Sequence, residues 1–193
     1  MHGVSSSLID HVKRRLRYDD WCGRNRLGQT LCACNWTVKT GDVQGWTICK
    51  QRGPSRLDTQ DNLGRQMVQA RGLKRDATPK TSPRMVRTFC TNVSVPNAMV
   101  RIDLFECASR EEAHESLVRI VSDFESPLIE ELKGPIGDVA FAGRGTGLIL
   151  FARANLVYLV RNVGRRAVSV EPNALALAAM LLLITRCAVA SRR

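Results

Sequence analysis

The stretch GDVAFAGRGTGLILFARANLVYLVRN, residues 137–162, decides the fold because it places a glycine-rich loop between two apolar runs. A loop that cradles phosphate is normally followed by a helix, whose first N–H groups point at the anion. No Gly-Lys-Ser/Thr and no helical pattern follows these glycines, which argues against a P-loop or a dinucleotide fingerprint. The residues after Gly147 are rich in Leu, Val, Ile, Phe and Tyr, which favours strands.

We therefore interpret GRGTG as a loop between two antiparallel strands, with Arg144 exposed at its tip. An anion site at Arg144 is the alternative. A tight turn is expected at Ala154-Asn155. The strands of this region are predicted at residues 139–142, 148–153 and 156–162, with a short extension at 167–170.

Two more strands are predicted upstream, at residues 84–95 and 98–107, with a turn at Pro96-Asn97. In the second of them Val100, Ile102 and Leu104 alternate with polar residues and form the apolar face. Trp46 and Ile48 alternate in the same way within residues 43–50, so a further short strand is expected there.

A helix is predicted at residues 109–125. Ser109 and Glu112 form a capping box at its start, and apolar residues follow at helical spacing. Ser126-Pro127 ends it, because the residue before proline avoids helical geometry. A second helix is expected at 172–186, with Pro172 in its first turn. The chain is thus predicted to be α+β, with an antiparallel sheet of four to six strands packed by these two helices.

The charge divides the chain into two parts. Lys and Arg outnumber Asp and Glu by 16 to 7 in residues 1–85, but only by 13 to 11 in the remainder. Residues 84–193 are predicted to form the compact domain. Residues 1–83 are predicted to be a basic extension of low order, with a candidate helix at 7–17 and the strand at 43–50.

The longest apolar run, residues 174–184, has 11 residues, whereas a membrane-spanning helix needs about 20. We therefore expect a buried core helix there and no transmembrane segment. The N-terminal residues lack the apolar core and cleavage site of a secretory signal. This favours the cytoplasm, with the cell envelope as the alternative if the protein's true start is not Met1.

The Gly137-Asp138 turn before a strand, and the Arg153-Ala154-Asn155 turn between the last two strands, resemble a pattern in small bacterial α+β domains of uncharacterised function. Many of those proteins are lipoproteins or other cell-envelope proteins. The resemblance covers about residues 84–185. It implies a fold and no particular activity, because one fold can carry many functions.

The seven cysteines are odd in number and scattered, which favours reduced thiols over a disulfide framework. The weak candidates for a metal site are Cys22, Cys32, Cys34 and Cys49, spaced C-x9-C-x-C-x14-C. Structural zinc sites usually show paired cysteines two to four residues apart, so we predict no metal and no cofactor.

No catalytic constellation is visible. His114 follows Glu111 by one helical turn and could act as a base, but no nucleophile is placed to use it, so it is predicted to be an exposed helical histidine. The sequence therefore favours a non-enzymatic protein over a small hydrolase.

The net charge of +11 makes an anionic partner plausible, and Trp21, Trp36 and Trp46 could stack on bases. The first hypothesis is a non-enzymatic accessory or binding domain of a bacterial type. The second is a nucleic-acid-associated protein that binds phosphates through the basic extension. The partner and the oligomeric state are left open. The candidate anion-binding residues are Arg14, Arg15, Arg17, Lys74, Arg75 and Arg144.

Overall fold

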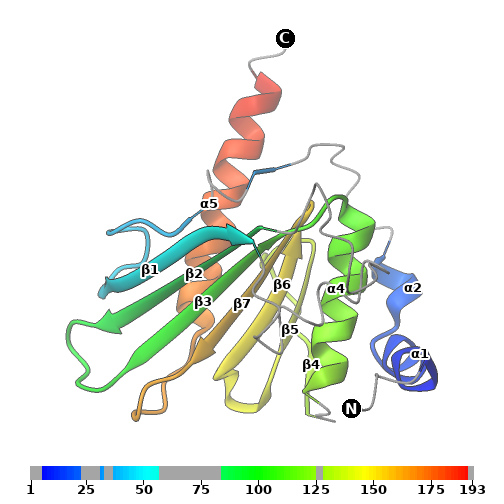
Figure 1. The fold of residues 1–193 in the computed structure, drawn as a ribbon, viewed down its shortest axis with the longest axis horizontal. Coiled ribbons are helices and arrows are strands. Elements are labelled where there is room, and N and C mark those ends of the chain that lie inside the picture. The colour runs from blue at the N-terminus through cyan, green and yellow to red at the C-terminus, as the bar shows by residue number, and fades with distance from the viewer. Residues whose placement is uncertain (1–5, 23–30, 33–36, 57–83, 125–127, 191–193) are drawn as a thin grey trace.

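The structure is a computed structural model that describes residues 6–22, 31–32, 37–56, 84–124 and 128–190. One antiparallel sheet of seven strands runs through it, in the order β1-β2-β3-β7-β6-β5-β4 (Figure 1). The predicted α+β class with an antiparallel sheet is confirmed, and the sheet has more strands than the four to six expected. The strands are β1 (Trp46–Arg56), β2 (Arg84–Asn92), β3 (Met99–Glu106), β4 (Glu130–Glu131), β5 (Val139–Ala142), β6 (Leu148–Arg153) and β7 (Leu156–Asn162).

The sheet consists of two meanders that meet at one ladder. β1, β2 and β3 pair in chain order, and so do β4, β5, β6 and β7. The ladder between β3 and β7 joins the two meanders, with Val100 opposite Asn162 and Glu106 opposite Leu156. This ladder pairs strands that are far apart in the sequence, because α4 and three strands lie between β3 and β7.

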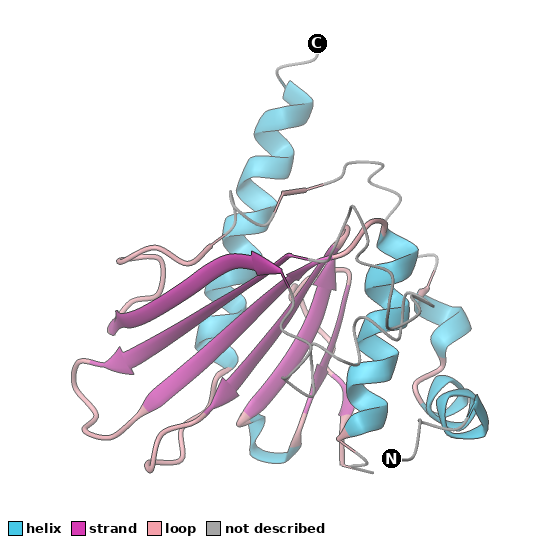
Figure 2. Cartoon of the chain, viewed as in Figure 1, coloured by secondary structure: helices cyan, strands magenta, loops and turns pink. Residues whose placement is uncertain are grey.

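Helices cover both faces of the sheet (Figures 1 and 2). α4 (Arg110–Asp123) lies on one face and α5 (Glu171–Ala190) on the other, where helices were predicted at 109–125 and 172–186. Two short N-terminal helices, α1 (Ser6–Arg15) and α2 (Tyr18–Trp21), lie beyond α4. No described helix is both long and apolar enough to cross a membrane.

The core on the α5 side uses the apolar face predicted for β3. Val100, Ile102 and Leu104 are at most 2% exposed and share a cluster with Ala174 and Leu177 of α5. Trp46 and Ile48 of β1 also pack against this cluster, so the first strand belongs to the same sheet and core.

The core on the α4 side has two layers. Phe105 and Leu150 of the sheet pack with Leu117 of α4, and Val12 and Trp21 belong to the same cluster from beyond α4. α4 is consequently buried on two opposite sides. Its start follows the predicted capping box: Glu112 N–H donates to Ser109 Oγ at 3.2 Å, while Ala108 N–H donates to the Glu112 carboxylate at 2.6 Å.

Where the structure describes residues 1–83, they take part in both cores. Trp21 is fully buried on the α4 side, and Leu31 and Val38 are buried on the α5 side. α1 covers Ser6–Arg15, close to the helix expected at 7–17. β1 covers Trp46–Arg56, shifted toward the C-terminus from the strand expected at 43–50. Residues 57–83 lie outside the described residues.

Two strand predictions need correction. β2 ends at Asn92 and not at residue 95, because the Asn92 side chain accepts the N–H groups of Ser94 and Val95 and turns the chain. Residues 167–170 form no strand. Instead, Val170 N–H donates to the carbonyl of Thr146 at 2.8 Å, which ties the start of α5 to the loop between β5 and β6.

Candidate anion-binding surface

A basic surface lies on the α4 side of the sheet, beside the area that α4 covers. α4 packs on β6 and β7, whereas β1, β2 and β3 lie beside it in the described structure (Figure 1). The pairing register aligns two rows of side chains on this side. The upper row consists of Lys50, Phe89, Arg101 and Arg161, and the lower row contains Arg52, Arg87 and Asp103. We call these seven residues the basic sheet face.

The alternation of each strand places these residues together. Phe105 of β3 and Leu159 of β7 point into the α4-side core. Side chains two or four positions apart in a strand lie on the same face of the sheet. Arg101 and Asp103 therefore share the face of Phe105, and Arg161 shares the face of Leu159. In β1 a bulge between Ile48 and Lys50 changes which residues of the strand point to each face of the sheet. Trp46 and Ile48 therefore face α5, while Lys50 and Arg52 face the opposite side and are exposed.

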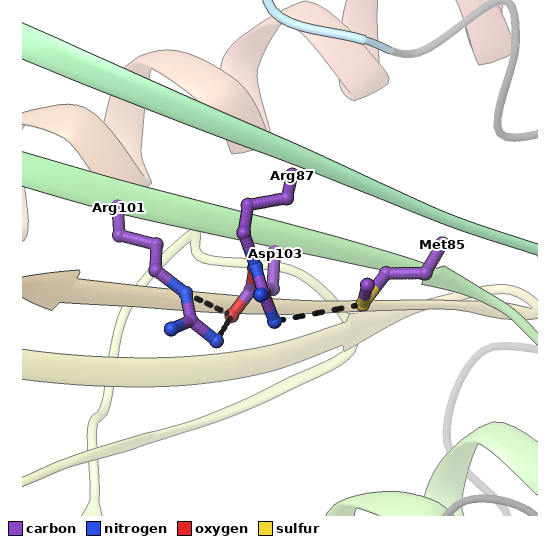
Figure 3. A network of polar contacts seen from close by, with 4 residues as sticks. All are labelled: Met85, Arg87, Arg101 and Asp103. Carbon is purple, nitrogen blue, oxygen red and sulfur yellow. Dashed lines mark hydrogen bonds and ion pairs between the residues drawn. The ribbon is translucent and has the colours of Figure 1, made fainter. Parts of the chain in front are cut away.

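Asp103 is the centre of this face (Figure 3). Its side chain is fully buried and accepts from Arg87 Nε at 2.6 Å and from Arg101 Nε at 2.7 Å and Nη2 at 2.6 Å. Arg87 Nη2 also lies 3.9 Å from Met85 Sδ. The side chains of Arg87 and Arg101 are 19% and 13% exposed, so one buried carboxylate holds two arginines that are themselves partly accessible. The positions of both guanidinium groups are thus set before any ligand arrives.

The same register places like charges directly opposite each other. Arg52 is paired with Arg87 across β1 and β2, and Arg101 with Arg161 across β3 and β7. Like charges in directly opposed positions destabilise a sheet by roughly 0.2–1 kcal/mol per pair. The face has five basic side chains and one carboxylate, a formal charge of about +4. An anion bound here would reduce this repulsion.

Phe89 lies within the upper row of the face. It is directly opposite Lys50 on one side and Arg101 on the other. Its side chain is half-buried, in contrast to the fully buried Phe105, Phe141 and Phe151 of the two cores. The face thus combines cations with an accessible aromatic ring.

The residues predicted from the sequence as anion-binding do not come together. Arg14 and Arg15 are exposed on α1, beyond α4. Arg17 is exposed too and forms an ion pair with Asp20. Arg14 and Arg17 line a surface hollow that also contains three carboxylates, so its charge is mixed. Lys74 and Arg75 lie outside the described residues.

The loop with Arg144 is the predicted hairpin connection. β5 and β6 pair antiparallel, and between them Arg144–Thr146 form a short 3-10 turn, η2, followed by a strand. Thr146 Oγ1 lies 2.6 Å from Ser169 Oγ, so the loop holds the segment before α5. Arg144 is exposed, on a different edge of the sheet from β1. No helix N-terminus follows the loop to bind an anion.

The cysteines form no metal cluster in the described part of the chain, where no group of three or more potential ligands occurs. Cys22 follows α2, whereas Cys49 lies in β1 at the far edge of the sheet (Figure 1). Cys22, Cys32 and Cys49 are free thiols, and Cys34 lies outside the described residues.

His114 is buried, and the prediction of an exposed histidine is wrong. Its ring contacts Trp21 edge-on, with 5.3 Å between centroids, and Nδ1 lies 3.1 Å from the carbonyl of Cys22. A carbonyl can only accept, so we place the proton on Nδ1. Burial lowers the pKa of His114 below its usual value. The histidine belongs to the contact between α2 and α4, which the helix pattern of residues 109–125 alone does not reveal.

The tryptophans are not on the basic sheet face. Trp21 is fully buried and donates from Nε1 to the carbonyl of Leu16 at 2.8 Å, so it cannot stack on a base. Trp46 packs against the α5-side core, and Trp36 lies outside the described residues.

The two turns that carry the resemblance to bacterial α+β domains are in contact. The side chain of Asp138 is fully buried. It accepts the Ala154 N–H at 2.8 Å, as expected for a turn aspartate, and it accepts from Arg153 Nη1 at 3.0 Å. No protein-family model, no curated protein and no solved structure matches this chain. Membership of that bacterial group therefore stays a prediction.

Proposed function

We propose that this protein is a non-enzymatic binding domain that holds an anionic partner on its basic sheet face. The observation that carries the proposal is the arrangement around Asp103, where two arginines share one carboxylate and each lies opposite a further arginine. This arrangement keeps positive charge on the surface even though it costs stability.

The arginines suit an anion with several oxygens. A guanidinium group carries five N–H donors in a planar fork that matches carboxylate and phosphate groups. Arg101 uses Nε and Nη2 for Asp103, and its remaining donors have no partner among the described residues. Lys50 and Arg52 are exposed beside it and add long-range attraction for an approaching anion.

The residues of the face favour binding over catalysis. A hydrolase needs a nucleophile within reach of a base. Asp103 is engaged by two arginines, and His114 is enclosed by α2 and α4. A location in the cytoplasm also stays part of the proposal, and the binding function does not depend on it.

The test uses heparin as a generic polyanion, measured by titration calorimetry at several salt concentrations. We expect Lys50→Ala/Arg52→Ala to weaken binding at least tenfold and to reduce the slope of log affinity against log salt by about two, one for each lost contact. The matched control is Arg14→Ala/Arg15→Ala, which removes the same charge from α1 and should change both quantities little.

The same comparison separates the sheet face from the N-terminal extension. If Arg14→Ala/Arg15→Ala or Lys74→Ala/Arg75→Ala weakens heparin binding while Lys50→Ala/Arg52→Ala does not, the extension is the binding site. If the wild-type protein binds no heparin even at low salt, the proposed function is wrong.

A further inference from the structure

We infer that the anionic partner is a single-stranded nucleic acid, with a base stacked on Phe89 and the flanking phosphates bound by the cations of the basic sheet face. This inference rests on the proposed function and adds the chemical class of the ligand. It comes from the position of one aromatic ring among the cations, which a partner recognised by charge alone would not use.

Phe89 has cations on both neighbouring strands. Lys50 and Arg101 are its directly opposed partners, and Arg87 lies two positions away on β2, on the same face. Adjacent strands are about 4.8 Å apart, so the row from Lys50 to Arg161 extends over about 14 Å. A sugar-phosphate backbone can therefore pass beside the ring and meet positive charge on either side of it.

The ring of Phe89 is available for stacking. Phe141 contacts Trp21, and Phe151 stacks on Tyr158 at 4.7 Å between centroids, so these rings are occupied inside the protein. Among the described residues Phe89 has no such aromatic or cation partner, and its side chain is half-buried. A partly exposed ring between cations is an arrangement that proteins use to bind unpaired bases.

The same arrangement disfavours a duplex. In a double helix the base faces are hidden by stacking, so a duplex would contact only the cations and would make no use of the ring. An acidic protein segment would likewise be attracted by the charges alone. Phe89 could instead merely cover the aliphatic stems of the neighbouring arginines, and this reading predicts equal effects on every ligand.

The experiment measures fluorescence anisotropy with labelled oligo(dT) and oligo(U), a duplex of equal length, and labelled heparin, each with the full chain. We expect wild-type protein to bind both single strands more tightly than the duplex. Phe89→Leu should weaken single-strand binding about 5- to 150-fold, the effect of losing one base stack, and should leave heparin binding within twofold. Phe89→Trp should restore single-strand binding, because it retains an aromatic surface.

The outcomes distinguish the inference from the proposed function. Absence of binding to heparin and to all oligonucleotides contradicts both. Heparin binding with no preference for single strands, or an equal loss for all ligands in Phe89→Leu, contradicts only the inference. Oligo(U) bound more tightly than oligo(dT) would identify RNA as the source of the strand, and the reverse would identify DNA.

A second measurement requires no mutation and so stands even if Phe89→Leu does not fold. Oligo(dT) in which 5-iodouracil replaces thymine is irradiated in complex with the wild-type protein, and the adduct is located by mass spectrometry. Trypsin releases residues 88–101, in which Phe89 is the one aromatic residue. We expect the cross-link on Phe89, and a cross-link confined to residues outside the basic sheet face would overturn the inference.

Discussion

The side chain of Asn155 bonds the backbone of Leu31 in both directions. Its Nδ2 donates to the Leu31 carbonyl at 3.0 Å, and its Oδ1 accepts the Leu31 N–H at 2.6 Å. Nδ2 also donates to the carbonyl of Cys107 at 2.9 Å. A single amide in the turn between β6 and β7 therefore fastens an N-terminal segment 124 positions away to the sheet.

We predict that Asn155→Ala lowers the free energy of unfolding by about 2–4 kcal/mol, because three buried backbone groups lose their partner. The matched control is Asn162→Ala, in which an asparagine also bonds two backbone groups, but near the surface. It should cost about 1 kcal/mol or less. Urea denaturation of the two variants checks this, and equal losses would show that the bonds to Leu31 contribute little.

Asp103 provides the second prediction. Asp103→Asn keeps the shape of the side chain but removes the negative charge that Arg87 and Arg101 contact, so we expect a loss of about 2–4 kcal/mol in the free energy of unfolding. Replacing all three residues by apolar ones, Asp103→Leu/Arg87→Leu/Arg101→Met, should recover most of this loss. The triple variant should also lose heparin binding. A stable triple variant that still binds heparin would show that these arginines are not part of the site.

His114 makes stability depend on pH. Its folded-state pKa is lowered by burial, so between that value and the ordinary value of about 6.5 the unfolded chain binds a proton that the folded protein does not. Stability is therefore complete above about pH 6.5 and falls as the pH decreases, by at most about 1.4 kcal/mol per unit. The nearby charges are Asp138, Arg110 and Glu111, of which only Arg110 acts in the same direction as burial.

Chemical denaturation of the wild-type protein and of His114→Leu at pH 7.5 and pH 5.5 tests this. We expect the variant to lose stability overall but to show less decrease between the two pH values. His11→Gln, on α1, is the control and should behave as the wild-type protein. An unchanged pH dependence in His114→Leu would assign the effect to other groups.

Alanine variants of Gly137 and Gly145 distinguish the cost of backbone strain from the cost of a steric clash. Both have left-handed backbones, with φ of 67° and 72°. A Cβ at Gly137 would lie 2.4 Å from the carbonyl oxygen of Ala152, whereas nothing lies within 4 Å of a Cβ at Gly145. Gly145→Ala should therefore cost about 1 kcal/mol, the strain alone. Gly137→Ala should cost about 3 kcal/mol or more, because the strand pairing must shift as well. Thermal melts of both variants provide the measurement.

Local signals in the sequence predicted most of the elements. Ser109 and Glu112 identified the start of α4, and the alternation of Val100, Ile102 and Leu104 identified both β3 and its buried face. These features depend on neighbours within a few positions, so they can be read without the tertiary structure. β1 was only partly predicted, because the bulge after Ile48 breaks its alternation and Gly53 and Pro54 interrupt its second half.

The candidate site was missed for a different reason. Arg101 and Asp103 alternate visibly within one strand, but the partners of Arg101 are set by the register of β3 on β2 and β7. Nothing local specifies that register, so the excess of basic residues in the N-terminal part of the sequence favoured the extension instead. The burial of His114 has the same origin, because α2 covers it from almost a hundred positions away.

The ladder between β3 and β7 also has a consequence for the folding rate. Each meander can form from contacts between consecutive strands, but the β3–β7 ladder must close a loop of about fifty residues. Arg101 and Arg161 meet only when this ladder forms, and their mutual repulsion opposes its formation. Exchanging Arg161, which does not bond Asp103, for a neutral residue should therefore accelerate refolding, so the charge that attracts a ligand also slows the assembly of the sheet.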